Sequence, residues 1–308
     1  MAPSSLCALR SFWSAPPLNR IPKGILYILL SCFFFSLMGA IVKILGERLG
    51  SLELVFFRNL FGIFIIGASL LHRPAIERGG RVWMLIFRGI WGSTALLAYF
   101  YNITQIPLAT AFTLTQTTPL FIALFSLLLL HESVKKEVWL AIFLGFGGVL
   151  LLYPPTLPSF SPLIGFTGLY SGLGAALAYL SISELKNHYE NRTIILSLTL
   201  SGTLIPFVLL FFGGEEAAWG GWVMPTLREW VWISALGIIS TLGQIFLTKA
   251  YASMQPSILG AVSYVTILFT TGWGLLLGDS LPSLVGALGM ILIAFGGILS
   301  AHQGAKRS

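Results

Sequence analysis

Polar side chains recur at helical spacing inside long apolar stretches of this sequence, where they could contact a solute. One stripe with i, i+3, i+4 spacing consists of Arg88, Trp91, Gly92, Ala95, Tyr99 and Asn102. A second stripe, far downstream, consists of Gly237, Ser240, Gln244, Thr248 and Tyr251. Two helices with matching polar faces are expected to line one common cavity.

Arg88 is the charged residue of these two stripes. It lies about 10 Å along its helix from Arg81 at about 1.5 Å per residue, too deep for free exposure. An arginine at that depth needs water, a partner or a ligand, although snorkelling toward the headgroups is an alternative. A guanidinium suits a carboxylate or a phosphate, so we predict an electropositive cavity and a substrate with at least one anionic group. Arg58, nearer the other interface, is interpreted as structural, with a partner on another helix.

Aromatic residues on or beside polar stripes could stack on a planar or cationic part of a ligand. Packing is the alternative for each of them, because tyrosine and tryptophan also fill helix interfaces. The predicted substrate-binding residues are Arg88, Trp91, Tyr99, Gln116, Tyr179, Gln244 and Tyr264.

Catalytic, cofactor and metal motifs are not found in the sequence. It has no phosphate-binding Walker loop, no H-E-x-x-H and no nucleophile elbow, so we expect no enzyme, no cofactor and no metal. Cys7 and Cys32 have neither the number nor the spacing of a metal site or a disulfide framework. The acids and histidines of the apolar stretches lie at their ends, which favours facilitated diffusion or exchange over proton symport.

The composition is that of a membrane protein. Of 308 residues, 56% are hydrophobic and only 9% are charged, and the mean hydropathy is +0.87. A span needs about 20 apolar residues to cross about 30 Å of hydrocarbon. Ten such windows lie near 24–45, 51–71, 82–101, 108–130, 137–153, 163–183, 193–213, 229–251, 256–277 and 282–301.

Basic residues predict how the spans are oriented. Most lysines and arginines between the spans fall on the side that holds both termini, which the positive-inside rule assigns to the cytoplasm. Residues 1–23 and 302–308 are then cytoplasmic tails, with a short organelle transit peptide as the alternative for the first. We expect a bacterial inner-membrane protein. The formal net charge of +7 is loop charge, so no nucleic acid is expected as a partner.

An internal repeat is indicated by two similar hexapeptides, GFGGVL at 145–150 and AFGGIL at 294–299. They fall in the fifth and tenth windows, so we predict two five-helix repeats over 24–153 and 163–301. An odd number of spans per repeat inverts the second copy, an architecture that suits alternating access around a central cavity. Chance similarity of glycine-rich helices is the alternative.

The sequence resembles the EamA-type members of the drug/metabolite transporter superfamily. The resemblance rests on ELVFFR at 53–58, Arg88-Gly89, the passage TTPLFIALFSLLLLHES and the GFGG/AFGG pair. It implies a basket-like bundle whose cavity is lined by the first four spans of each repeat, with the fifth and tenth at the periphery. Members move amino acids, nucleotide-like metabolites and other small organic solutes. Pro119 has no proline partner in the ninth window, which departs from a symmetric pattern.

These observations predict an all-α polytopic membrane protein of ten transmembrane helices that acts as a secondary transporter. Its substrate is a small anionic or zwitterionic metabolite, an amino acid or a nucleoside/adenosyl-type compound, moved by an exchanger or facilitator. Pro107 and Pro256, at equivalent helix ends, are the predicted gating residues, with an ordinary turn as the alternative. The other expected partner is membrane lipid, and a homodimer is left open. A non-transporting membrane sensor or assembly scaffold is the alternative function.

Overall fold

A computed structural model describes residues 22–106, 108–131, 133–152, 161–212, 222–276 and 283–305. These residues form helices and connecting loops, and no strand occurs among them. The helices are α2 (Lys23–Leu45), α3 (Ser51–His72), α4 (Val82–Gln105), α5 (Leu108–Thr115), α6 (Thr118–Leu128), α7 (Lys136–Leu152), α8 (Pro162–Leu185), α9 (Asn191–Phe212), α10 (Leu227–Ser253), α11 (Pro256–Ser263), α12 (Val265–Leu276) and α13 (Leu284–Ala305).

The described chain has nine helical segments that are long and apolar enough to cross a membrane. Each window predicted from the sequence coincides with one helix or with two consecutive helices. The fifth window corresponds to α7, which at 17 residues is shorter than the usual length of a span. The structure is therefore that of an all-α integral membrane protein.

The fourth and ninth windows are each divided between two consecutive helices, α5 and α6 in one and α11 and α12 in the other. Pro119 lies in the first turn of α6, where its missing N–H costs no helical hydrogen bond. Thr118 Oγ1 donates to the carbonyl of Thr115 at 2.6 Å, across the gap between α5 and α6. The gap between α11 and α12 at Tyr264 has no proline, and there Thr266 Oγ1 donates to the carbonyl of Ser263 at 2.7 Å.

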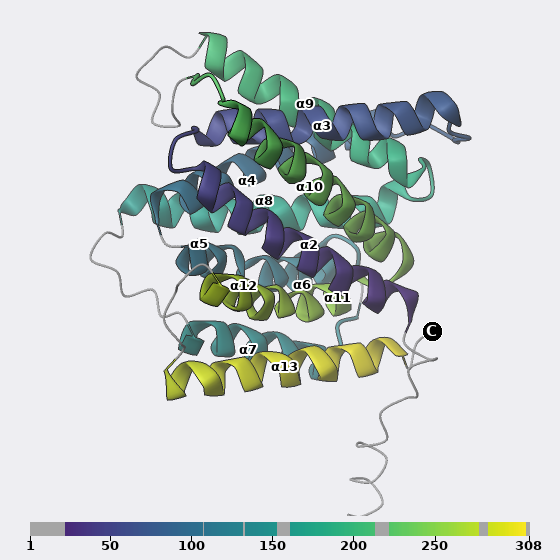
Figure 1. The fold of residues 1–308 in the computed structure, drawn as a ribbon. Helices are drawn as coiled ribbons and strands as arrows, with labels where there is room; N and C mark the ends of the chain where they lie inside the picture. The colour runs from purple at the N-terminus through teal and green to yellow at the C-terminus, as the bar shows by residue number, and fades with distance from the viewer. Residues whose placement is uncertain are drawn as a thin grey trace, which may run out of the picture.

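The helices are arranged in layers, which can be followed in Figure 1. α3 and α9 pack together at one edge of the molecule, and α7 and α13 pack together at the opposite edge. Between these edges, α2 packs against α10 and α4 packs against α8. The broken segments α5–α6 and α11–α12 lie between this central layer and the α7–α13 pair.

The two repeated glycine motifs bring α7 and α13 into close contact. A Cβ atom at Gly148 would lie 2.6 Å from the carbonyl oxygen of Gly289, and one at Gly296 would lie 2.8 Å from that of Ala141. Neither backbone can move aside cheaply, so both positions require glycine at this helix separation. Small residues are the usual means by which helices approach closely in a membrane.

The beginning of α10 is held by a local network of polar side chains. Thr226 and Glu229 form a capping box, in which each side chain bonds the backbone N–H of the other residue. Arg48, in the loop between α2 and α3, bonds Glu229 with an N–O distance of 2.7 Å. The loop after α2 is thereby tied to the start of α10, which packs along α2.

Candidate functional site

A cavity of about 140 Å³ lies among α2, α3, α4, α8, α10 and the two broken segments. No described residue of α7 or α13 lines it, which agrees with the peripheral place that the resemblance implied for the fifth and tenth spans. Both helix interruptions face it, through Thr115, Gln116 and Thr118 on one side and Ser263 and Thr266 on the other. Interrupted helices at a cavity are typical of solute sites in membrane transporters, because their free backbone groups need polar surroundings.

Five of the seven predicted substrate-binding residues are brought together at this cavity. Arg88 and Tyr99 come from α4, Gln116 from the gap between α5 and α6, Tyr179 from α8 and Gln244 from α10. Arg88, Tyr99 and Gln244 belong to the two polar stripes, whereas Gln116 and Tyr179 come from other segments. The structure does not test whether they bind a substrate.

Trp91 lies outside the cavity although it belongs to the α4 stripe. Its ring centroid is 5.9 Å from that of Phe87 and 5.9 Å from that of Tyr170 on α8. The cavity is lined instead by Arg88, Gly92 and the residues one and two turns further along. A residue three positions after Arg88 is rotated about 60° to one side of it, and α8 covers that side.

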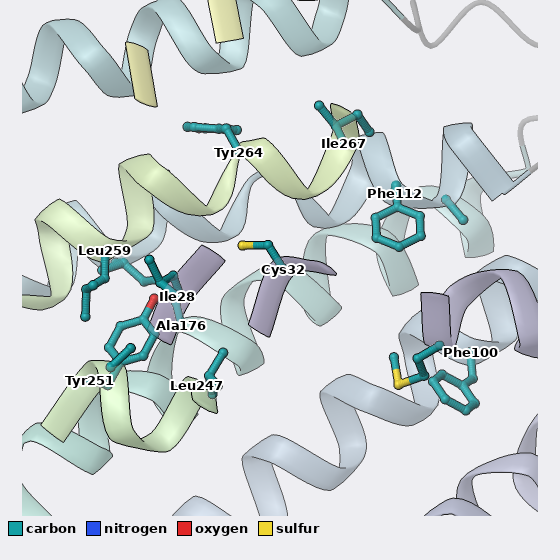
Figure 2. Packing of buried hydrophobic residues seen from close by; sticks show 14 of the residues in the cluster. Ile28, Cys32, Phe100, Phe112, Ala176, Leu247, Tyr251, Leu259, Tyr264 and Ile267 are labelled. Carbon is teal, nitrogen blue, oxygen red and sulfur yellow. The ribbon is translucent and has the colours of Figure 1, made fainter. Parts of the chain in front are cut away.

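Tyr264 also lies outside the cavity. It follows α11 at the interruption, and its ring lies where a side chain at Gly145 of α7 would have to go. Figure 2 shows Tyr264 on the opposite side of its segment from Cys32, which lines the cavity. Tyr264 thus fills the space left by the first glycine of the GFGG motif.

The two predicted gating residues have different outcomes. Pro107 lies outside the described residues. Pro256 is buried and is the first residue of α11, after Gln255 at the N-cap. Proline is favoured at that position because its N–H would be unpaired in any helix.

Arg88 is the largest fully buried side chain among the described residues, with 1% of its surface exposed. Its Nε and Nη2 atoms are buried and bond no described atom. Gly92, one turn later, provides the room for the guanidinium, because a Cβ there would collide with Nη1. A buried guanidinium with free N–H groups is a strong binding site for an anion.

Arg58 is a cavity residue that sequence reasoning treated as structural. It is 4% exposed, it lines the same cavity as Arg88, and its Nε atom has no partner among the described residues. The partner expected on another helix is not found in the described part of the chain: Nη1 donates to Oδ1 of Asn59, its own neighbour, at 2.9 Å. Arg58, Arg88 and Tyr179 all line this one cavity. The sequence does contain a signal for this role, because Arg58 is a second arginine within a span and no acidic residue lies one turn away from it.

Three further polar groups of the cavity are unpaired. Gln116 Nε2, Tyr99 OH and Ser31 Oγ are buried without a hydrogen-bond partner in the described part of the chain. No aspartate or glutamate is among the described residues that line the cavity. A ligand rich in oxygen would supply acceptors for these unpaired donors.

A second, larger hollow of about 1050 Å³ lies near the ends of α3, α8 and α10. Its charged groups are partly paired: Arg192 Nη2 lies 2.6 Å from Oε2 of Glu190, and this hydrogen bond lowers the pKa of the Glu190 carboxyl. Lys249 lies over the rings of Tyr27 and Phe246. The charged groups of this hollow are exposed or already partnered, so the smaller central cavity is the stronger candidate for a solute site.

A polytopic helical bundle with a buried, cation-lined cavity beside interrupted helices is the architecture of a membrane transport protein. Comparison with known proteins agrees, because residues 22–153 match the EamA-like transporter family. The chain belongs to this family, in the drug/metabolite transporter superfamily, which confirms the resemblance seen in the sequence.

Relatives extend this similarity over most of the chain. The pseudopaline exporter CntI of Pseudomonas aeruginosa strain UCBPP-PA14 is 35% identical over 90% of this chain and 95% of its own length. The S-adenosylmethionine uptake transporter of Rickettsia prowazekii strain Madrid E is 23% identical over 80% of this chain and 82% of its own. A crystal structure that is 19% identical has a TM-score of 0.72, over 95% of this chain and all of the other, and it shows the shared fold.

Proposed function

We propose that this protein is a secondary transporter for a small anionic or zwitterionic organic metabolite in a bacterial inner membrane. The observation that carries the proposal is the buried guanidinium of Arg88, whose Nε and Nη2 have no described partner, in a cavity with no carboxylate among its described lining residues. Such a charge is costly in a membrane unless a ligand or water meets it. An amino acid or an adenosyl-type compound offers the required anionic or oxygen-rich group.

The names of the relatives support transport but differ in solute and direction. One relative is named an exporter of pseudopaline and the other an uptake transporter for S-adenosylmethionine. We propose neither solute for this chain, because the residues that line the cavity determine selectivity. Sequence identities of 35% and 23% allow many differences among those residues. We likewise propose no direction of transport.

Alternating access would come from two inverted five-helix repeats, with both termini in the cytoplasm. The packing supports this: exchanging the proposed halves turns the α2–α10 pair into the α8–α4 pair and leaves the α3–α9 and α7–α13 pairs unchanged. A two-fold axis in the membrane plane has this effect. The same cavity could then open to either side by rocking of the halves.

Exchange or facilitated diffusion is preferred over proton symport. A proton-coupled site usually contains a buried acid or histidine, and the described lining of this cavity contains neither. The alternative, a sensor or assembly scaffold, would spread its polar groups over lipid-facing surfaces. Here the unpaired polar atoms of several helices meet at one cavity.

Uptake by proteoliposomes tests the proposal. The purified full chain is screened with labelled carboxylates, amino acids, phosphorylated metabolites and S-adenosylmethionine. Arg88→Ala and Arg88→Lys should both lower uptake of the transported solute by roughly tenfold to a hundredfold, the usual worth of a charged hydrogen bond. Trp91→Phe, outside the cavity, is the matched control and should transport normally. Normal uptake by Arg88→Ala would exclude Arg88, and no transport of any solute would favour the scaffold.

A further inference from the structure

The cavity contains two buried arginines where the proposed function uses one. Arg58 lies about 10 Å from the start of α3, and Arg88 lies about 10 Å from the start of α4, at about 1.5 Å per residue. The two arginines come from consecutive helices, and their neighbours Asn59 and Gly89 both pack against α9, near Gly202 and Ser201. Both guanidiniums are buried, and their charges repel each other.

We infer that the cavity binds a solute with two anionic groups, one bound by Arg58 and the other by Arg88. The inference rests on the proposed transport function and narrows its substrate class to dicarboxylates or molecules with a carboxylate and a phosphate. The two guanidiniums hold three buried nitrogen atoms without partners, namely Nε of Arg58 and Nε and Nη2 of Arg88. Each guanidinium offers unpaired donors from its own helix, which suits a solute with one anionic group for each arginine.

The charge balance of the cavity leads to the same solute class. Two like charges in a medium of low dielectric constant repel strongly, and no lining carboxylate offsets them. A monoanion leaves one charge uncompensated. A zwitterion brings an ammonium group next to the second guanidinium, which is worse. Only a dianion neutralises both arginines, and Gln116 Nε2 and Tyr99 OH offer further donors to its oxygens.

Arg58 is held in place rather than free to turn away. Asn59 accepts from Arg58 Nη1 at 2.9 Å, and its own Nδ2 donates to the carbonyls of Val55 at 2.8 Å and Gly202 at 3.3 Å. Gly202 belongs to α9, so the contact between α3 and α9 fixes the amide that orients the guanidinium. This preorganisation lowers the entropy lost when an anion binds.

The test compares solutes of equal length that differ only in charge. Binding to the detergent-solubilised full chain is measured calorimetrically, at constant ionic strength, for dicarboxylates of three to six carbons, their monocarboxylates and the matching ω-amino acids. The best dicarboxylate should bind at least tenfold more tightly than its two counterparts. Arg58→Gln should remove that preference and keep weak monocarboxylate binding, whereas Arg58→Lys should retain part of it.

Several outcomes would overturn the inference. One is equal binding of the three solute classes. Another is an unchanged dicarboxylate preference in a folded Arg58→Gln protein. If Arg58→Gln does not fold, a weaker dicarboxylate preference in Arg58→Lys and Arg88→Lys supports the inference, and an unchanged preference in both contradicts it. Transport of a monoanion or zwitterion that depends on Arg88 and not on Arg58 would also contradict it and would leave the proposed function intact. Tight dicarboxylate binding without transport would instead contradict the proposed function.

Discussion

Single polar side chains form hydrogen bonds with backbone groups at helix ends that would otherwise be unpaired in this membrane protein. Lys43 of α2 donates from Nζ to the carbonyl oxygens of Ile103 and Ile106, each at 3.2 Å. These carbonyls lie at the C-terminal end of α4, where the last turn has no helical partners. A cation there also interacts favourably with the helix dipole. Lys43 is thus a structural residue that ties α2 to the end of α4.

Lys43→Met should destabilise the protein by about 1 kcal/mol, because the methionine keeps much of the length of lysine but donates no hydrogen bond. The measurement is the thermal unfolding midpoint in detergent. Lys23→Met is the matched control, since Lys23 is exposed at the start of the same helix. Equal midpoints for the two variants would mean that the Lys43 contacts contribute nothing to stability.

At the scale of helices, the glycine motif determines how closely α7 and α13 pack. Gly148 faces the backbone of α13, whereas its neighbour Gly147 has open space where a side chain would begin. The two glycines are adjacent in the same helix and differ in what an added side chain would contact. They form a matched pair for measuring the cost of overpacking.

Gly148→Ala should lower stability by about 1–3 kcal/mol, because the added methyl group meets a carbonyl oxygen of the backbone rather than a flexible side chain. Gly147→Ala should be neutral or stabilising by up to about 1 kcal/mol, because alanine is the better helix former. Thermal unfolding of both variants in one detergent checks the difference. A Gly148→Ala protein as stable as Gly147→Ala would show that α7 and α13 do not pack closely in the membrane.

At the scale of the whole molecule, the proposed inverted halves predict gates at opposite ends of α2. Thr104, near the end of α4, packs by Gly46, just after α2, and Ser253, at the end of α10, packs by Gly24, near its start. If the halves rock around the cavity, one of these contacts should open as the other closes.

Single cysteines at Thr104 and Ser253 test this motion in a background that lacks Cys7 and Cys32. Their rates of labelling by a membrane-impermeant reagent, applied to each side of proteoliposomes, should change in opposite directions when a transported solute is added. The sidedness of labelling also reports the orientation of the chain. Rates that rise or fall together would contradict gating by two inverted halves.

The sequence by itself determined the helical membrane fold and the polar face of each helix. Span length follows from the thickness of the bilayer, and helical periodicity places Arg88 and Gln244 on polar stripes whatever surrounds them. Pro119 likewise marks the interruption before α6 from local chemistry alone.

Only the tertiary structure decided which part of each polar face meets the cavity. Trp91 belongs to the same stripe as Arg88, but α8 covers its side of α4, and Tyr264 turns toward the space left by Gly145. Arg58 lines the cavity because Asn59 and the α3–α9 contact orient it. Periodicity places a side chain on its own helix, whereas its surroundings depend on neighbouring helices that are distant in sequence.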